Sequence, residues 1–327
     1  MSFLVFLEGL RSPFLNHVFM FITQFGSEAA FFGVALYIFW CRNKREGYYL
    51  LSVGFFGEIL GQFLKIVCRI PRPWVVDKKF EPVSAALADA GGYSFPSGHT
   101  QNAVGTYVGI SRYEKIPILR IICIVLAVLV PLSRMYLGVH TPLDVGVGAA
   151  ISLLFVFGFY PMFAKNARKG SCYPLLGVML ACSAAFVAYT MLHRFPTDVD
   201  AVNLAEAQKN AWSFLGGMAA MLLAYWFDDE LLGFETDAVW WAQAMKLSIG
   251  AALTLAIKEG LKEPLLALLH GYPAAHAIRY ALVVIFLPSR TTAFATMLAY
   301  TVMQCLYTGF LKRVPYVDVA TLSLGFV

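Results

Sequence analysis

The feature that most constrains this chain is a succession of apolar runs, several of them about twenty residues long. A helix rises about 1.5 Å per residue, so about twenty apolar residues cross the hydrocarbon core of a bilayer. Hydrophobic residues make up 59% of the 327 residues and charged residues 14%, against roughly 45–50% and about 25% in soluble domains. These proportions exclude a disordered chain and a soluble globular enzyme, and they predict a polytopic membrane protein.

The apolar runs predict an all-α bundle of nine or ten membrane helices, with a short amphipathic helix on the bilayer surface at residues 1–10. Six helices are expected at residues 16–40, 47–68, 97–111, 117–137, 142–163 and 173–192. After a polar segment at 193–210, further helices are expected at 211–227, 238–257, 275–287 and 291–311, and the last two could instead be one kinked helix and a tail. We therefore expect a six-helix core over residues 1–192 and an extension of three to four membrane helices, without an assigned role, over residues 193–327.

Basic residues are distributed unequally between the two sides of this bundle. The loops after the first, third and fifth expected helices hold Arg42, Lys44, Arg45, Arg112, Lys115, Lys165, Arg168 and Lys169. Cytoplasmic loops of membrane proteins carry an excess of Lys and Arg. The opposite side, which includes the polar stretch 69–95, is therefore expected to face away from the cytoplasm.

Charge and cysteine usage exclude several other classes of protein. The net charge of +5 is mild, which gives no indication of a nucleic-acid partner. The six cysteines are scattered and form no Cys-x-x-Cys pair, so neither a metal knuckle nor a disulfide framework is expected.

Three polar clusters stand at helix ends that share one side of the predicted bundle. The first runs from Lys65 to Pro73, the second from Phe95 to His99, and the third from Ser133 to Asp144. Consecutive spanning helices alternate in direction, so all three clusters are expected to meet at the extracytoplasmic face.

Five residues of these clusters are suited to binding a phosphate. Lys65, Arg72 and Arg134 have few acidic partners close in sequence, and clustered cations repel one another unless an anion lies between them. Arg offers bidentate donors to phosphate oxygens, and Lys offers a point charge. Ser97 and Gly98 open a helix whose backbone N–H groups and positive dipole end also favour an anion.

The remaining candidates are suited to phosphoryl and proton transfer. His140 can attack phosphorus as a nucleophile, and His99 can protonate the leaving oxygen. Asp144 can hold the ring of His140 in the tautomer that frees the attacking nitrogen. The two histidines then need opposite protonation states, so their environments must push their pKa values apart.

Each of these residues also has a purely structural interpretation. Ser97 is a good N-cap, and the segment from Thr141 to Asp144 matches a capping box. Arg134 is favourable near a helix C-terminus, and Lys65 can extend to the membrane interface. Taken singly these interpretations are favoured, but eleven positions in three ordered clusters on one face indicate a site. For Ser97 and Asp144, capping and a catalytic role are compatible.

The pattern Lys-x6-Arg-Pro, Pro-Ser-Gly-His and Ser-Arg-x5-His-x3-Asp resembles the three-part signature of the type 2 phosphatidic-acid phosphatase superfamily. This superfamily includes lipid phosphate phosphatases, undecaprenyl pyrophosphate phosphatases, glucose-6-phosphatases and vanadium haloperoxidases. The resemblance covers residues 16–192 and shows no departure at a signature position.

The resemblance implies a metal-independent phosphatase without a cofactor. It implies that His140 is the nucleophile that forms a phosphohistidine, that His99 is the general acid and that Asp144 is the partner of His140. The residues that it implies for phosphate binding are Lys65, Arg72, Ser97, Gly98 and Arg134.

The expected function is hydrolysis of a lipid phosphate or pyrophosphate, of the phosphatidic acid, phosphatidylglycerol phosphate or undecaprenyl pyrophosphate class. A lipid phosphotransferase, a glucose-6-phosphatase-like enzyme and an anion-binding transporter are the alternatives. The expected partners are the lipid substrate and membrane lipids, with no nucleic acid. The style of the signature favours a bacterial inner membrane with the site facing outside, and neither the particular lipid nor the oligomeric state follows from the sequence.

Overall fold

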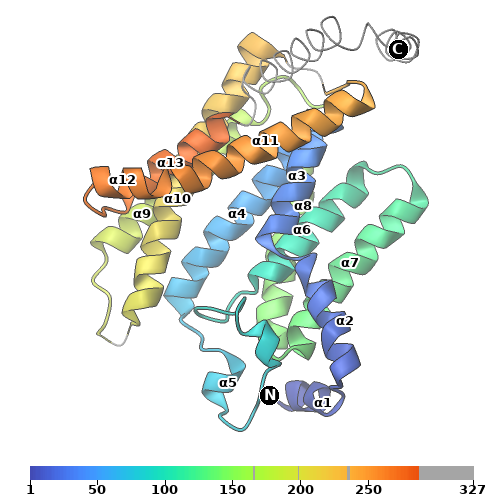
Figure 1. Ribbon diagram of the computed structural model, residues 1–327, viewed down its shortest axis with the longest axis vertical. Coiled ribbons are helices and arrows are strands. Elements are labelled where there is room, and N and C mark those ends of the chain that lie inside the picture. The colour runs from blue at the N-terminus through green and yellow to red at the C-terminus, as the bar shows by residue number, and fades with distance from the viewer. Residues whose placement is uncertain (165, 198, 234–235, 287–327) are drawn as a thin grey trace, which may run out of the picture.

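The computed structural model describes residues 1–164, 166–197, 199–233 and 236–286, and within these ranges the regular structure is entirely helical. The helices are α1 (Ser2–Gly9), α2 (Pro13–Gln24), α3 (Glu28–Cys41), α4 (Lys44–Cys68), α5 (Pro73–Val76), α6 (Gly98–Tyr113), α7 (Pro117–Tyr136), α8 (Pro142–Phe163), α9 (Tyr173–Leu192), α10 (Ala201–Phe227), α11 (Trp240–Gly260), α12 (Lys262–Leu268) and α13 (Ala274–Phe286) (Figure 1). A short 3-10 turn covers Ser84–Ala86, and a π-helical turn at Asp228–Leu232 follows α10.

Several of these helices can cross a membrane. In the described part of the chain, α4, α7, α8 and α9 are long and apolar enough to span a bilayer, and α2 with α3 forms a fifth, bent span. Many apolar side chains on the outside of the bundle are exposed, among them Ile121, Val128 and Leu154. The chain is therefore an integral membrane protein, as the apolar runs predict.

The first expected helix, at residues 16–40, is in fact two helices. The chain bends by 43° between α2 and α3, and Ser27 begins α3 by accepting a hydrogen bond from the Ala30 N–H. Gly26 lies in the bend, where an added Cβ would stand 2.7 Å from the carbonyl oxygen of His99. The break therefore lets the backbone pack directly against the first turn of α6.

The helix expected at residues 97–111 forms as α6. It is too short and too polar to cross the apolar core of a bilayer by itself. It packs against α3, α4, α7 and α8, and most of its residues are buried. Gly105 and Gly109 face α4, where an added Cβ would lie 3.1 Å from Val53 and 2.7 Å from Leu50. Because protein rather than lipid surrounds α6, its polar side chains are tolerated at membrane depth.

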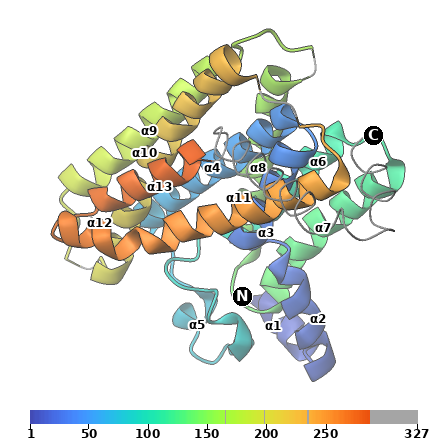
Figure 2. The ribbon, with the colours of Figure 1, turned by 45° about the horizontal axis from the view of Figure 1, so that its top comes forward.

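The C-terminal part differs most from the sequence-based expectation. Helix α10 begins at Ala201, inside the expected polar segment, and Asp200 caps it by accepting from the Asn203 N–H at 2.9 Å. Figure 2 shows α10 beside α9 and α13. Within the described residues, α10 and α11 are long enough to cross a bilayer but are not counted as spans, because polar and charged residues interrupt their apolar stretches. The described parts of α12 and α13 are shorter than a span. The helix expected at 291–311 lies outside the described residues.

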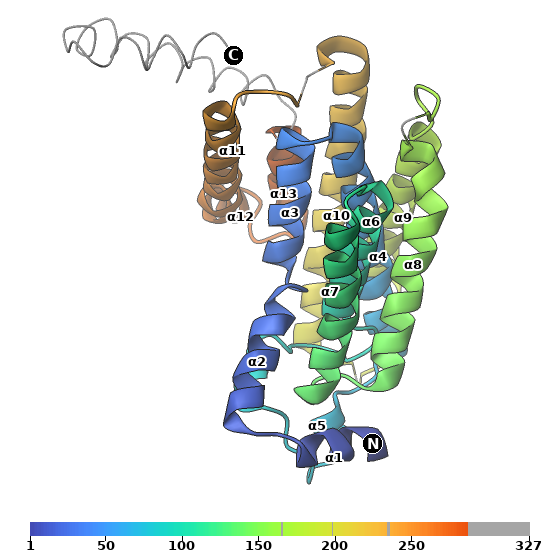
Figure 3. The ribbon, with the colours of Figure 1, turned by 90° about the vertical axis from the view of Figure 1, so that its right-hand side faces the viewer.

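The ends of the helices separate two faces of the bundle. Figure 3 shows the loop between α3 and α4 and the loop between α8 and α9 at one end. The segment between α4 and α6 and the turn between α7 and α8 lie at the opposite end, where α1 runs across the bundle (Figure 3). The three polar clusters therefore meet at one end of the bundle.

Candidate active site

The three clusters surround a cavity of about 350 Å³ at this end of the bundle. Of the expected site residues, Lys65, Arg72, Gly98, His99 and His140 line it. Asp144 lies behind His140, while Ser97 and Arg134 are buried beside the cavity and are not among its lining residues. The cavity wall also contains carboxyl and amide side chains, namely those of Glu28, Glu58, Gln62, Asn102, Asn203 and Glu206.

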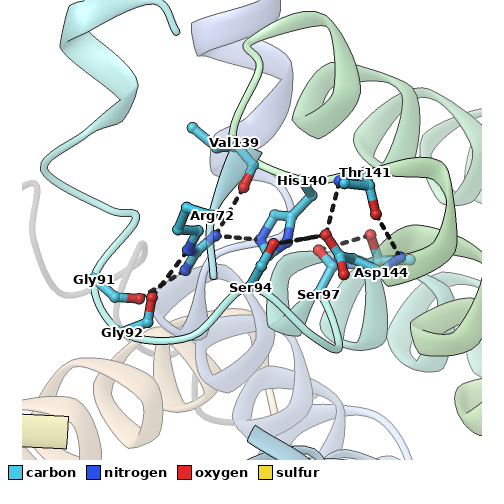
Figure 4. Close-up of polar contacts among 10 residues, drawn as sticks. Arg72, Gly91, Gly92, Ser94, Ser97, Val139, His140, Thr141 and Asp144 are labelled. Atoms are coloured by element: carbon cyan, nitrogen blue, oxygen red, sulfur yellow. Dashed lines mark hydrogen bonds and ion pairs between the residues drawn. The ribbon is translucent and has the colours of Figure 1, made fainter. Parts of the chain in front are cut away.

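Arg72 is held by the backbone of two loops (Figure 4). Its Nε and Nη2 donate to the carbonyl oxygens of Gly92 and Gly91, at 3.2 and 2.7 Å. Its Nη1 donates to the carbonyl oxygen of Val139 at 2.9 Å and lies 2.9 Å from Nε2 of His140. The guanidinium group therefore bridges the segment before α6 and the turn that carries His140.

The contact with Arg72 assigns the tautomer of His140. A guanidinium group only donates hydrogen bonds, so Nε2 of His140 must accept and carries the lone pair. The proton of the neutral ring is then on Nδ1, which lies 3.6 Å from Oδ2 of Asp144 and 3.4 Å from Oγ of Ser94. This tautomer leaves Nε2 as the nitrogen that can attack an electrophile.

Asp144 caps α8 and also lies against His140. Its Oδ2 accepts from the Thr141 N–H at 2.7 Å, and the Asp144 N–H donates to Oγ1 of Thr141 at 3.3 Å, which confirms the capping box. The same Oδ2 accepts from the Ser94 hydroxyl at 2.6 Å. Asp144 is fully buried, so the start of α8 fixes this carboxylate against the ring of His140.

The surroundings of His140 favour its neutral form. Burial is the main cause that lowers its pKa, to about 3, and the positive charges of Arg72 and Arg134 act in the same direction. The hydrogen bond with Asp144 opposes this effect. A neutral imidazole at neutral pH is the form that a nucleophilic histidine requires. Burial, followed by the positive charge of Arg134, also lowers the pKa of His99, to about 2. The protein alone therefore favours the neutral form of both histidines and does not push their pKa values apart, contrary to the expectation from the sequence.

Arg134 is aimed into the protein interior with part of its donor capacity unused. It is 1% exposed, and its Nη1 donates to Oγ1 of Thr23 in α2 at 2.9 Å. Its Nε and Nη2 are buried without an acceptor among the residues that the structure describes. Buried unpaired donors are costly, and the oxygens of a bound anion are a suitable acceptor for them.

Ser97 and Gly98 occupy different positions relative to the cavity. The Ser97 hydroxyl accepts from the Thr100 N–H at 3.4 Å, and the Ser97 N–H donates to the Asp144 carbonyl oxygen at 3.1 Å. Ser97 is thus a buried N-cap, and its own backbone N–H is paired with Asp144. Gly98 lines the cavity at the first turn of α6.

Sequence reasoning did not single out Ser94, Thr23 or the polar residues of α10. Ser94 lies three residues before Ser97 and contacts both His140 and Asp144. Thr23 is far from Arg134 in the chain, and no local pattern connects the two. Asn203 and Glu206 fall in a stretch whose polarity indicated a loop. The helix was therefore expected to begin at residue 211, ten residues after its true start at Ala201.

Comparison with known proteins gives the family. The PAP2 superfamily model matches residues 45–168, and a model for the transmembrane extension of PAP2 superfamily phosphatases matches residues 212–288. The chain belongs to the PAP2 superfamily of membrane phosphatases, and it is a hydrolase of that lipid phosphatase family.

Three relatives show how far the similarity extends. The chain is 33% identical over 161 residues to phosphatidylglycerophosphatase B of Bacillus subtilis (45% of this chain, 75% of the relative), and 32% identical over 135 residues to undecaprenyl-diphosphatase of Sulfolobus acidocaldarius (41% and 64%). It is 26% identical over 289 residues to sphingosine-1-phosphate phosphatase 1 of Rattus norvegicus (82% and 65%). No solved structure matches the chain.

Proposed function

We propose that this protein hydrolyses a lipid phosphate or pyrophosphate at the extracytoplasmic face of the membrane, through a phosphohistidine on His140. The observation that carries the proposal is the state of His140. Its ring is buried and neutral, its Nε2 lone pair faces Arg72 at the cavity, and its Nδ1 faces Asp144. The names of the relatives, which cover phosphatidylglycerophosphate, undecaprenyl diphosphate and sphingosine 1-phosphate, support the same range of substrates.

In the first half-reaction the phosphate lies between the cations and the two histidines. Lys65, Arg72, Arg134 and the first turn of α6 bind its oxygens, and the phosphate takes up the unused donors of Arg134. Nε2 of His140 attacks phosphorus, and the bond between phosphorus and the leaving oxygen breaks. The negative charge of the bound phosphate offsets the cations around His99 and favours its protonated form, and His99 gives that proton to the leaving oxygen. Asp144 stabilises the positive charge that develops on the ring of His140.

In the second half-reaction His99, now neutral, accepts a proton from water. The water oxygen attacks phosphorus, the bond between phosphorus and Nε2 breaks, and inorganic phosphate leaves. The ring of His140 returns to its neutral form, and His99 has regained its proton. Arginine and lysine supply the charge that stabilises the transferring phosphoryl group, so we propose that the reaction needs no metal ion.

The arrangement of the chain fits a lipid substrate. The cavity opens at the end of a bundle whose outer surface is apolar, so a head group can reach it while the tail stays in the bilayer. We propose a core over residues 1–192 that carries the chemistry, and an extension over residues 193–327 whose further membrane helices pack beside it.

The decisive experiment is phosphate release by protein purified in detergent, with a chelator present. The panel contains phosphatidic acid, phosphatidylglycerol phosphate, undecaprenyl pyrophosphate, sphingosine phosphate and glucose 6-phosphate. His140→Ala should abolish release, since the attacking nitrogen is gone. His193→Ala is the matched control, because His193 is exposed on the same face and stacks on Tyr189 outside the cavity.

The outcomes separate the candidate functions. Release that survives in His140→Ala, or that depends strictly on Mg²⁺, would contradict the proposed mechanism. Transfer of the phosphate to a second lipid, seen by mass spectrometry, would indicate a phosphotransferase, which uses the same first half-reaction. Release only from glucose 6-phosphate would place the enzyme with soluble substrates instead.

A further inference from the structure

The first turns of α10 form part of the wall of the active-site cavity. Asn203, Glu206 and Ala207 line it together with residues from α3, α4 and α6. These three positions lie between the two segments matched by the family models, 45–168 and 212–288. The wall that they build is therefore additional to the phosphate-binding residues of the three clusters.

Asn203 lies beside the loop that holds Arg72. Its N–H donates to Oδ1 of the capping residue Asp200 at 2.9 Å, so its place in the first turn of α10 is set. Its Oδ1 lies 3.5 Å from the position that a Cβ would occupy at Gly92. The Gly92 carbonyl oxygen accepts from Arg72, and the α10 wall thus stands next to the phosphate-binding end of the cavity.

Glu206 follows Asn203 by three residues, so both lie on one face of α10. Its side chain lines the cavity together with Lys65. Two further carboxylates line the same cavity, Glu28 at the start of α3 and Glu58 in α4. Glu58 lies close to the first turn of α6, because a Cβ added at Gly98 would stand 3.6 Å from Oε1 of Glu58.

The cavity therefore combines a cationic end with an acidic wall. A phosphate group at neutral pH presents acceptor oxygens and negative charge, which carboxylates repel. The acidic wall is complementary instead to hydrogen-bond donors on the rest of the head group. Glu58 lies on the same helix as Lys65 and lines the cavity with it, so a carboxyl group other than Glu206 is available to that ammonium group.

We propose that the α10 wall selects the substrate, with Glu206 as the specificity-determining residue and Asn203 as its neighbour that positions the wall. The preferred substrates are phosphate esters whose head group carries a hydrogen-bond donor, an ammonium or a hydroxyl group, close to the phosphate. This inference rests on the proposed phosphatase function and refines its substrate class.

The test compares three lipids in mixed micelles of matched composition. Sphingosine phosphate carries an ammonium group on the carbon next to the one that bears its phosphate. Phosphatidylglycerol phosphate carries a hydroxyl group in the same position relative to its terminal phosphate. Phosphatidic acid carries an acyl ester there, which has no donor. Ratios of kcat/KM are measured for wild type, Glu206→Gln and the control Glu81→Gln. Glu81 lies in an exposed loop at the same end of the bundle and does not line the cavity.

Wild type should prefer at least one donor-bearing lipid over phosphatidic acid. Glu206→Gln should reduce that preference roughly three- to tenfold, the range expected for one hydrogen bond or ion pair at a partly exposed site. Comparison of sphingosine phosphate with phosphatidylglycerol phosphate then shows whether Glu206 recognises the ammonium or the hydroxyl group. Glu81→Gln should keep the wild-type ratios. A ratio is independent of the fraction of active protein, so partial unfolding cannot imitate the effect.

An equal loss on all three lipids, or unchanged ratios in Glu206→Gln, would overturn the inference while the phosphatase function stands. A wild-type enzyme that prefers phosphatidic acid would overturn it in the same way. If wild type released phosphate from none of the panel, the proposed function itself would fail, and the inference would fail with it.

Discussion

At the scale of single residues, two contacts define His140. Arg72 faces Nε2 at 2.9 Å, while Asp144 and Ser94 face Nδ1. Donors on one side and acceptors on the other allow only one neutral tautomer. The ring is thus prepared for attack before a substrate binds, and the phosphate has only to displace Arg72 from Nε2.

Arg134→Lys should reduce kcat/KM by about 100-fold, since loss of one group that stabilises transition-state charge costs roughly 3 kcal/mol. A lysine supplies one point charge, whereas the guanidinium group holds Thr23 with one nitrogen and leaves two others unpaired. Steady-state kinetics measures the effect. Arg120→Lys is the matched control, because Arg120 binds the Glu114 carbonyl oxygen at the opposite end of the bundle. Equal activity in both variants would remove Arg134 from the site.

The lowered pKa of His140 predicts how stability depends on pH. The unfolded chain binds a proton on this histidine below pH about 6.5, and the folded protein does not until pH about 3. Acid therefore favours the unfolded state, and this contribution to stability is lost as pH falls from 6.5 towards 3, by at most about 1.4 kcal/mol per pH unit.

Thermal unfolding in detergent measures this effect by comparison of wild type with His140→Gln. The melting temperature of wild type should fall more steeply between pH 6.5 and 4.5, because other titrating groups are common to both proteins. Parallel curves would show that His140 is protonated as readily in the folded protein as in the unfolded chain.

At the scale of elements, the site depends on where helices begin. The starts of α6 and α8 meet, since the Ser97 N–H donates to the Asp144 carbonyl oxygen at 3.1 Å. Gly148, in the second turn of α8, lies where an added Cβ would stand 2.9 Å from the Ser97 carbonyl oxygen. The approach of these two helix ends places His99 and His140 on one cavity.

Gly148→Ala should destabilise the protein by about 1–3 kcal/mol, the usual cost of forcing an extra methyl group into a packed contact. Its kcat should fall as well, because α6 must shift away from α8. Gly146→Ala provides the control on the same helix, since nothing lies within 4 Å of its added Cβ. That variant should be neutral or slightly stabilising, because alanine favours a helix more than glycine does. Melting curves that rank the two variants in the reverse order would contradict this packing.

At the scale of the whole molecule, the distribution of charge predicts which end faces the cytoplasm. Lys44 begins α4, Arg112 lies in the last turn of α6, and Lys169 lies between α8 and α9, all at the end opposite the cavity (Figure 3). Lys79 lies in the segment between α4 and α6, at the cavity end. The excess of basic residues at the first end predicts that it is cytoplasmic.

Labelling of single cysteines in a cysteine-free background tests this orientation. A membrane-impermeant maleimide should label Lys79→Cys on intact cells, and it should label Lys169→Cys only after permeabilisation. Both side chains are exposed, so accessibility within the fold does not limit either reaction. The reverse pattern would place the cavity in the cytoplasm and exclude an extracytoplasmic substrate.

Much of this architecture follows from local patterns along the chain. Apolar runs predict the spans, because lipid requires a continuous apolar stretch. The alternation of spanning helices brings Lys65, His99 and His140 to one face. The Thr141–Asp144 capping box was predicted in the same way, since its residues are neighbours along one turn of helix. Where protein replaces lipid around a helix, as for α6, hydropathy no longer measures the environment.

Only the tertiary structure shows the contacts between residues that are distant in sequence. The tautomer of His140 depends on its contact with Arg72, and the unused donors of Arg134 are recognised only once its contact with Thr23 is known. Glu206 reaches the cavity because α10 packs on α4 and α9. A sequence shows which side chains can do chemistry and near which end of a helix they lie. Distances of a few ångströms between separate helices are set by packing, and packing decides which nitrogen is free, which donor is unpaired and which carboxylate meets the substrate.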